Sequence, residues 1–263
     1  MKTLDTLIRA ALAAGALAAL SACGDSTPNL APSTSSIPSG EAGLPIKQGR
    51  LIAINTVSML KEHAGNGLRC SSCHINAGTL PNGGAWVRVQ AQDGQALAAR
   101  INRCLVESMN GKPLAADAPQ MQALHAYIGW LGTAKLTPEQ EPLARGFGPI
   151  DASLTPDPAR GAALYAERCA HCHGDHGEGI LEKPELGGGY KYPPLWGGQA
   201  ASAASEMNQL PMAAAFVKNN MPRTRTHALT AQQAVDVASY FVAQPHPAAG
   251  NGPSWRVADP ISH

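Results

Sequence analysis

The sequence contains the same six-residue pattern twice, and no other feature restricts its fold as much. The first copy reads RCSSCH, from Arg69 to His74, and the second reads RCAHCH, from Arg168 to His173. Each copy contains C-x-x-C-H, the spacing at which two thiols form thioether bonds with a haem while the histidine binds its iron. The sequence therefore predicts two covalently bound haem c groups. Each haem would supply apolar surface for the core of a chain that has few aromatic residues.

A zinc site or a thiol redox pair is the alternative interpretation of a C-x-x-C motif. Zinc ribbons favour ligands without the adjoining histidine, and here two copies occur in a chain with an export signal. The residues assigned to haem attachment are Cys70, Cys73, Cys169 and Cys172, and the proximal iron ligands are His74 and His173.

The N-terminus predicts export and attachment to a bacterial membrane. Lys2 and Arg9 precede an alanine-rich run too short to span a bilayer, and the run ends in LSAC, a lipoprotein cleavage pattern. We expect residues 1–22 to be the signal peptide and Cys23 to carry lipid, which predicts a periplasmic, lipid-anchored protein. An ordinary secretory peptide is the alternative. Residues 23–43, rich in Ser, Pro, Gly and Thr, predict a flexible tether.

The rest of the chain predicts an all-α protein with two small haem domains and a Pro-rich linker. Apolar periodicity predicts helices over residues 43–65, 94–110 and 118–132 in the first domain, and the second domain has a helix before its motif and another at its end. The predicted boundaries are 44–133 for the first domain, 134–156 for the linker, 157–247 for the second domain and 248–263 for a tail. The segments GAALYAERCAHCHGDHGEG, YPPLWG and NMP resemble class I cytochrome c, which implies that fold for both domains.

The second axial ligand of each haem sets its reduction potential, and the two domains differ in what they offer. In the second domain Met221 precedes Pro222, between the haem motif and the last helix, where class I cytochromes place a thioether ligand. Met207 and Met212 are the competitors, but their stretch is typical of a helix with methionine in its core. We predict Met221 as the ligand.

The first domain has no Met-Pro pair, and the unassigned Cys104 follows its motif. On an α-helix Arg100, Cys104 and Ser108 share one face. A guanidinium one turn away favours the thiolate, which binds iron and attacks sulfur, and it attracts an anionic substrate. A buried cysteine without chemical duty is the alternative. The other candidates for the iron ligand are Met109, Met121 and His125.

The segments GNGLRCSSCHINAGT and RINRCLVESMNGKPL, followed by a class I domain, resemble the thiosulfate dehydrogenase family of dihaem c-type cytochromes. The resemblance covers the chain from residue 44 to about residue 247. It implies an active site at the first haem. The implied iron ligands are His74 and Cys104 for the first haem and His173 and Met221 for the second. The implied anion-holding groups are Arg100, Ser108, Asn110 and Lys112.

The resemblance also implies the reaction and the partners. Two thiosulfates form tetrathionate, Cys104 carries a sulfur group between them, and two electrons leave through the His/Met haem to an acceptor such as another cytochrome c. The same site run backwards reduces tetrathionate. A non-catalytic, membrane-tethered dihaem electron carrier is the alternative, and a dihaem peroxidase is a third interpretation that lacks a convincing acid-base set. A net charge of +1 does not indicate nucleic acid as a partner.

Two stretches depart from the family pattern. The segment GGAWVRVQAQDGQ replaces a stretch with an additional arginine, for which Arg88 is the available substitute. Asn220 precedes Met221, so the lysine that exchanges with methionine in some members is absent there, and an exchange with Lys218 is not favoured.

Overall fold

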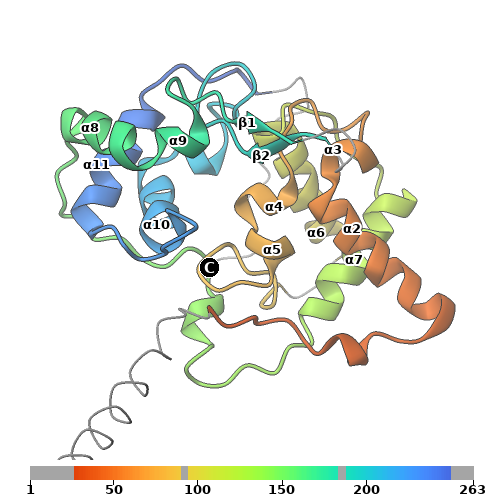
Figure 1. Cartoon of the computed structure of the whole chain (residues 1–263). Coiled ribbons are helices and arrows are strands. Elements are labelled where there is room, and N and C mark those ends of the chain that lie inside the picture. The colour runs from red at the N-terminus through yellow and green to blue at the C-terminus, as the bar shows by residue number, and fades with distance from the viewer. Residues whose placement is uncertain (1–26, 90–93, 183–187, 250–263) are drawn as a thin grey trace, which may run out of the picture.

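The structure, a computed structural model, describes residues 27–89, 94–182 and 188–249. Figure 1 shows them as two helical lobes, with the haem motif of each on a short helix. The predicted signal peptide, Cys23 and all of the tail after residue 249 lie outside the described residues. Within the described ranges, every helix is too short or too polar to cross a membrane.

The first domain is built around two long helices that cross each other. Its elements are α2 (Leu44–Ile54), α3 (Thr56–Met59), α4 (Cys70–Cys73), α5 (Ile75–Gly78), α6 (Gly94–Arg103), the π-helix η3 (Cys104–Ser108) and α7 (Pro119–Leu131). At the crossing of α2 and α7, a Cβ added to Gly49 would lie 2.1 Å from the carbonyl oxygen of Ala123. Only glycine permits this approach, and the helices bury Ile52, Tyr127 and Leu131 beside it.

The first predicted helix is wrong in its length, because it breaks at Asn55. The side chain of the next residue, the buried Thr56, explains the break. Its hydroxyl donates to the carbonyl of Ile52 over 2.9 Å and accepts from the backbone N–H of Cys70 over 3.0 Å. The bend therefore joins the helix directly to the first haem motif.

The prediction of a flexible tether is wrong from Leu30 onward. Leu30 is only 2% exposed, and its backbone N–H donates to the carbonyl of Thr79 over 2.8 Å. Two short 3-10 helices follow, η1 (Thr34–Ser36) and η2 (Gly40–Gly43), and the indole N–H of Trp130 donates to Ser36 over 3.0 Å. Apolar contacts with α7 outweigh the polar composition of this segment, which packs as part of the first domain.

The first part of the Pro-rich linker also packs on the first domain. Leu136 and Ala144 join its hydrophobic cluster, and the 3-10 helix η4 (Pro142–Ala144) lies in this stretch. The backbone N–H of Asn82 donates to the carbonyl of Leu143 over 2.9 Å. The first domain therefore extends beyond the boundary predicted at residue 133, because apolar side chains up to Ala144 pack on it.

The second domain repeats the crossing of two helices. Its elements are α8 (Pro158–Arg168), α9 (Ala170–His173), β1 (Ile180–Leu181), β2 (Tyr190–Tyr192), the 3-10 helix η6 (Glu206–Asn208), α10 (Leu210–Asn220) and α11 (Ala231–Val242). The two strands pair antiparallel, with Ile180 opposite Tyr192. A Cβ on Gly161 of α8 would lie 2.1 Å from the carbonyl oxygen of Asp236 in α11. The expected all-α architecture is confirmed apart from this short hairpin.

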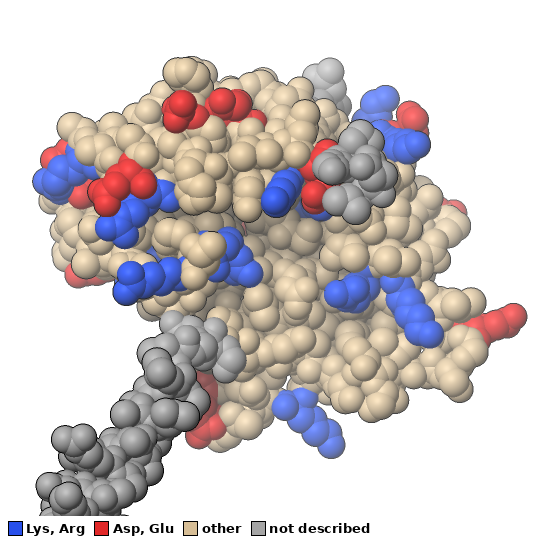
Figure 2. Space-filling model, in the orientation of Figure 1, with Lys and Arg blue, Asp and Glu red and all other residues tan. Residues whose placement is uncertain are grey.

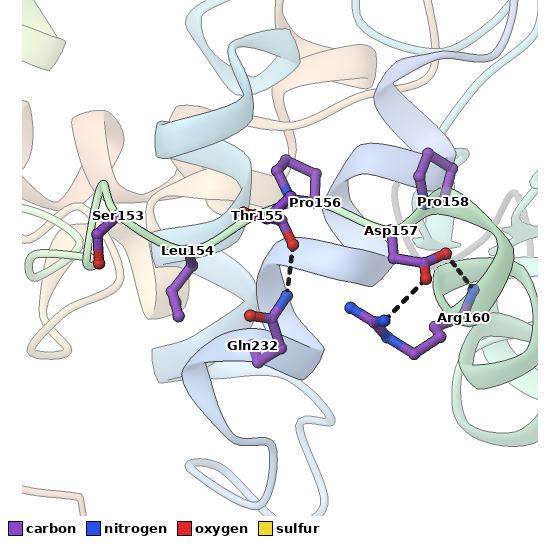
Figure 3. A pocket seen from close by; sticks show the side chains of 8 residues that line it. All are labelled: Ser153, Leu154, Thr155, Pro156, Asp157, Pro158, Arg160 and Gln232. Atoms are coloured by element: carbon purple, nitrogen blue, oxygen red, sulfur yellow. Dashed lines mark hydrogen bonds and ion pairs between the residues drawn. The ribbon is translucent and has the colours of Figure 1, made fainter.

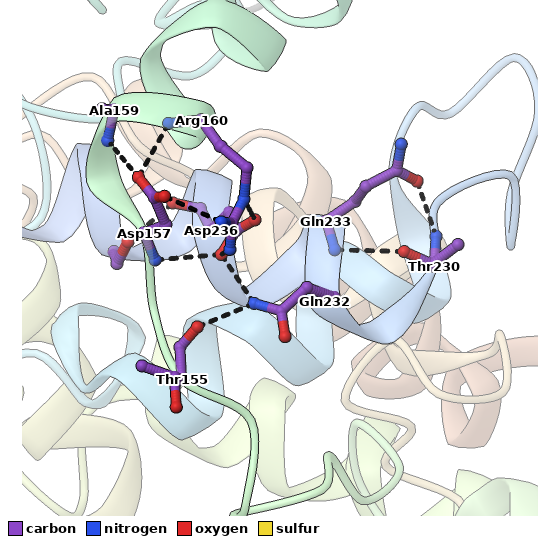
Figure 4. A network of polar contacts seen from close by, with 9 residues as sticks. Thr155, Asp157, Ala159, Arg160, Thr230, Gln232, Gln233 and Asp236 are labelled. Carbon is purple, nitrogen blue, oxygen red and sulfur yellow. Dashed lines mark hydrogen bonds and ion pairs between the residues drawn. The ribbon is translucent and has the colours of Figure 1, made fainter.

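A buried carboxylate ties the end of the linker to this helix crossing (Figure 4). Asp236 accepts hydrogen bonds from Arg160 Nε over 2.8 Å, from Gln232 over 2.7 Å and from the backbone N–H of Asp157 over 3.0 Å. Burial on its own would raise the pKa of the Asp236 carboxyl, but these donors together hold it below its usual value. Asp157 also caps α8, accepting from the backbone N–H of Ala159.

Direct hydrogen bonds join the two domains. The backbone N–H of Tyr190 donates to the carbonyl of Gly67 over 3.1 Å, and Arg69 pairs with Glu182 at 3.4 Å. Both contacts bring the hairpin of the second domain against the loop that precedes the first haem motif. The second domain therefore lies beside the first site rather than remote from it.

Candidate active site

The first haem motif presents its histidine in the form that binds iron. Cys70 and Cys73 begin and end α4, and His74 follows at its C-terminal end. The Nδ1 atom of His74 lies 2.7 Å from the carbonyl oxygen of Gly84, which as an acceptor requires a proton on Nδ1 and leaves Nε2 for the metal. Burial lowers the pKa of His74 to about 4, so the ring is neutral. Gly84 has a φ of +66°, and a Cβ there would lie 2.7 Å from Nδ1.

The second motif repeats this arrangement. Cys169 precedes α9, Cys172 lies within it and His173 ends it, 8% exposed. The Nδ1 atom of His173 lies 2.8 Å from the carbonyl oxygen of Pro193, and burial lowers the pKa of this ring as well. Each motif therefore offers two free thiols and a neutral histidine that a backbone carbonyl orients. This set of groups fits a covalently bound haem in each domain.

The structure brings Cys104 to the first motif, as predicted. The Cys104 thiol lies close enough to Cys70 and Cys73 to interact electrostatically with both. Burial raises the pKa of Cys104 to about 11, with a smaller contribution from Cys70, while Arg103 and Arg100 lower it. The expectation that one arginine sets the thiolate form is therefore too simple, because burial outweighs it. Coordination to iron deprotonates a thiol outright and would supply the missing stabilisation.

The helix that carries Cys104 is not a regular α-helix to its end. α6 stops at Arg103, and residues Cys104–Ser108 form the π-helix η3, closed by the backbone N–H of Met109 on the carbonyl of Cys104 at 3.0 Å. Such π-turns occur frequently at functional sites. The regular i, i+4, i+8 face predicted for Arg100, Cys104 and Ser108 is therefore wrong in its last step.

Arg103 is a site residue that the sequence pattern did not single out. Among the charged groups that lower the pKa of Cys104, Arg103 has a larger effect than Arg100. Arg100 also lowers the pKa of His74, so it acts on both the histidine of the first motif and Cys104. The helical spacing argument pointed to Arg100, and direct adjacency to Cys104 was the only signal for Arg103.

The remaining predicted anion-holding residues divide into two groups. Ser108 Oγ lies 2.9 Å from Ser205 Oγ of the second domain. Asn110 has a φ of +52°, and its Oδ1 is buried without a hydrogen-bond partner among the described residues, so it is available to a ligand donor. Lys112 is exposed, and its backbone contacts lie at His63 instead. Ser108 and Asn110 stay predicted site residues, both in contact with the second domain, and Lys112 stays a predicted one whose side chain is exposed.

The competing ligands and the substitute arginine differ in their surroundings. Met109 and Met121 are buried in the core of the first domain, at 4% and 0% exposure. His125 lies beside Gly94, burial lowers the pKa of its ring, and its Nε2 is buried without a hydrogen-bond partner among the described residues, so it stays an alternative ligand. Arg88 forms an ion pair with Glu141, which follows from the linker packing on this domain, and that pairing gives Arg88 a structural role.

Met221 is the predicted ligand of the second haem. It directly follows α10 and packs against the hydrophobic core of the second domain. Met207 and Met212, the competitors, lie in η6 and α10 and are both partly buried. The position of Met221 in the loop between α10 and α11 keeps it the predicted ligand.

A broad hollow on the described surface belongs to neither haem motif (Figure 3). Its volume is about 500 Å³, and it lies between the end of the linker and the start of α8 and α11. The polar side chains that line it already bind one another: Asp157 pairs with Arg160, and Gln232 donates to Thr155. Figure 2 shows that Lys and Arg instead border the hollow between the two lobes.

Comparison with known proteins agrees with this arrangement. The cytochrome c family matches residues 158–244. The chain is 34% identical to a thiosulfate dehydrogenase of Stutzerimonas stutzeri (strain A1501) over 226 residues, covering 82% of this chain and 72% of that protein. It is also 34% identical to a thiosulfate dehydrogenase of Allochromatium vinosum over 230 residues, covering 82% of this chain and 83% of the relative.

A solved structure matches over most of the chain. It is the thiosulfate dehydrogenase TsdBA of Marichromatium purpuratum in its as-isolated form, with a TM-score of 0.72 and 31% sequence identity. The match covers 84% of this chain but 50% of that chain, so this chain spans half the length of that larger protein.

Proposed function

This chain belongs to the thiosulfate dehydrogenase family, and from that membership we propose that it oxidises two thiosulfate ions to one tetrathionate at its first haem. It is a haem-containing oxidoreductase that acts on thiosulfate and delivers electrons to a redox partner. The more detailed proposal assigns His74 and Cys104 to the first iron, His173 and Met221 to the second, and two haem c groups to the chain.

One observation carries this proposal: a partly buried cysteine outside both haem motifs interacts electrostatically with Cys70 of the first motif and with two arginines. A thiolate is a nucleophile toward sulfur, and the neighbouring guanidiniums attract thiosulfate and offset its charge. An electron carrier needs neither a second thiol nor a cationic pocket beside its haem. The arrangement of Cys104, Arg103 and Arg100 therefore supports catalysis rather than electron transfer alone.

The chemistry of Cys104 is proposed to proceed in two balanced steps. The Cys104 thiolate forms a bond to the outer sulfur of one thiosulfate, and two electrons leave the sulfur pair as Cys–S–S–SO₃⁻ forms. A second thiosulfate then attacks the sulfur that Cys104 carries, so tetrathionate leaves and the thiolate returns. Haem, when bound, supplies the one-electron acceptors that this oxidation needs.

The side chains around Cys104 have distinct tasks in these steps. Arg100 and Arg103 offset the charge of the two dianions, which is greatest when the second thiosulfate approaches. We assign to the Ser108 hydroxyl and to an N–H of the Asn110 side-chain amide the role of donors to sulfonate oxygens; the Asn110 amide nitrogen also donates to the carbonyl of Ala200 over 3.4 Å and keeps a second N–H for this role. Cys104 is partly buried, which limits access of water to its thiol and strengthens each of these interactions.

Met221 gives the second domain its part in the proposal. A thioether ligand raises the potential of a haem above that of a haem with a thiolate ligand, so electrons move from the first domain to the second. They then leave to an external acceptor such as another cytochrome c. We also propose a periplasmic location with a lipid anchor at Cys23, and the reverse reaction, tetrathionate reduction, uses the same residues.

Anaerobic addition of thiosulfate to the oxidised holoprotein tests the function. We expect prompt reduction of the haem absorption bands and formation of one tetrathionate for every two thiosulfates consumed. Haems that stay oxidised with thiosulfate, yet are reduced by ascorbate or dithionite, would instead identify a non-catalytic dihaem carrier. Electron paramagnetic resonance of the oxidised protein tests the ligands, because a thiolate and a thioether give different low-spin signals.

A further inference from the structure

A segment of the second domain, residues 200–206, covers the stretch of the first domain that carries Cys104. The hydroxyl of Ser202 donates to the carbonyl of Glu107, and the side chain of Asn66 donates to the carbonyl of Ala200 over 3.2 Å. Ser108 and Ser205 meet at 2.9 Å. Three separate hydrogen bonds therefore hold this segment of the second domain against the first domain.

This covering segment is firmly held. Ala200 and Ser202 are fully buried, and Ser205 is 1% exposed. The Ser205 hydroxyl also accepts from the backbone N–H of Met207 over 3.3 Å, which caps the short helix η6. The first residue of that helix, Glu206, is consequently presented to the first domain in a defined position.

Glu206 brings a negative charge to the first haem site. Its carboxylate forms an ion pair with Arg103, the residue next to Cys104. Glu206 raises the pKa of the Cys104 thiol and that of His74, so its charge acts on both. The Glu206 side chain is 54% exposed and that of Arg103 is 25% exposed, which places the pair at the solvent edge of the site.

We propose that Glu206, from the second haem domain, is a specificity-determining residue of the first haem site that moderates the positive charge offered to thiosulfate through Arg103. An incoming dianion meets this ion pair at the edge of the site and competes with the carboxylate for the guanidinium. Glu206 thereby weakens binding of the dianionic substrate. The predicted effect on thiosulfate binding rests on the proposed function. The predicted effect on the haem rests only on the charge of Glu206 in its ion pair with Arg103.

The charge of Glu206 has a second consequence that needs no substrate. A carboxylate near a haem favours the oxidised, more positive iron and so lowers the reduction potential. Arg103 makes further contacts besides this ion pair, so the inference concerns the charge that Glu206 adds and not the number of partners of Arg103.

The test uses the full holoprotein with Glu206→Gln, which keeps the size of the side chain and removes its charge. We expect the KM for thiosulfate to fall by about three- to tenfold with kcat changed by less than about twofold, since the lost charge acts mainly on binding. The midpoint potential of the first haem, followed by its electron paramagnetic resonance signal in a redox titration, should move upward. Raising the salt concentration should shrink the KM difference because the pair is exposed.

Two further variants separate charge from structure. Glu206→Asp keeps the charge, so its KM for thiosulfate and the midpoint potential of its first haem should lie close to the wild-type values. Glu182→Gln removes the carboxylate of a second interdomain ion pair, the one with Arg69, and should leave the KM unchanged because Arg69 is not the neighbour of Cys104. Wild-type KM and potential in Glu206→Gln, or an equal KM shift in Glu182→Gln, would overturn the inference. Failure of the wild-type protein to oxidise thiosulfate would refute the proposed function, while the potential shift would still test Glu206.

Discussion

The two haem domains cross their long helices in the same way. Gly49 of α2 meets the backbone of α7, and Gly161 of α8 meets the backbone of α11; at either glycine an added Cβ would lie 2.1 Å from a carbonyl oxygen. The proximal histidines also match, because each directs Nδ1 to a backbone carbonyl. The same scaffold is therefore used twice, and it is not what distinguishes the two sites.

The distal sides of the two haem sites differ in every respect that matters for chemistry. The first offers the thiol of Cys104 on a π-helix beside Arg103, with Glu206 reaching in from the other domain. The second offers the thioether of Met221 at the end of α10, packed against an apolar core. A thioether carries no charge and does not attack sulfur, so the comparison supports the proposal that catalysis occurs at the first site and electron exit at the second.

The largest expected effect comes from removing Cys104, because this change removes the thiol that distinguishes the first site from the second. In Cys104→Gly we expect thiosulfate oxidation to fall by at least about a thousandfold, because the nucleophile itself is lost. Both haems should remain attached, since Cys70, Cys73 and their counterparts are untouched. Steady-state assays of tetrathionate and a haem stain of the denatured protein measure the two quantities. A variant that retains full turnover would refute the role of Cys104.

Filling the helix crossings tests whether the two scaffolds are equivalent. Gly49→Val and Gly161→Val should each destabilise the protein by about 3 kcal/mol, because a side chain at either site collides with backbone that cannot yield cheaply. Gly198→Val is the control, since no atom lies within 4 Å of its Cβ position. Urea denaturation followed by circular dichroism measures the effect. Equal stability of Gly198→Val and the other two would show that the crossings tolerate expansion.

The parts of the structure that depend on local pattern were predictable from the sequence. C-x-x-C-H defines the proximal half of each site within five residues, and apolar periodicity located α7 and α11 correctly. Cys104 was found because it was the cysteine left over once the motifs and the lipoprotein site were assigned. In each case the relevant residues are close in sequence or are identified by elimination.

The parts that depend on distant contacts were not predictable. The π-helix at Cys104 interrupts a segment with a regular helical pattern, and Ser205 and Glu206 reach the first site only because the two domains pack together. Leu30 lies in a polar stretch whose composition predicted a tether, yet it packs on the first domain. Tertiary packing overrides local composition at all of these positions.

Replacing the second distal ligand should affect electron exit and leave the sulfur chemistry intact. In Met221→Leu we expect steady-state turnover to fall about tenfold because the second haem loses its thioether and its potential decreases. The first reduction by thiosulfate in a stopped-flow experiment should keep its rate. Met207→Leu and Met212→Leu are matched controls and should behave as the wild type. A loss in either of them, with Met221→Leu unaffected, would reassign the ligand.

The smallest expected effect concerns Asp236, which faces Gly161 at the helix crossing of the second domain. Ala123 occupies the corresponding position, facing Gly49, in the first domain. The folded protein holds the pKa of Asp236 below its usual value, so ionised Asp236 stabilises the fold above the unfolded pKa near 4, and this contribution is lost as the pH falls through the folded value. Asp236→Asn should therefore lower the stability of the second domain by about 1–2 kcal/mol at pH 7. The difference from the wild type should vanish in acid.

Hydrogen exchange of α8 and α11, measured from pH 7 down to pH 3, places this effect in one domain. Exchange should quicken in Asp236→Asn at neutral pH in these two helices, while α2 and α7 keep their protection because their crossing contains Gly49 and no carboxylate at the facing position. Asp151→Asn is the control: hydrogen bonds from Ser153 also lower the pKa of Asp151, but this carboxylate is exposed. Equal loss of protection in both crossings would mean that the domains unfold together, and the interdomain contacts at Glu206 and Glu182 would then be the reason.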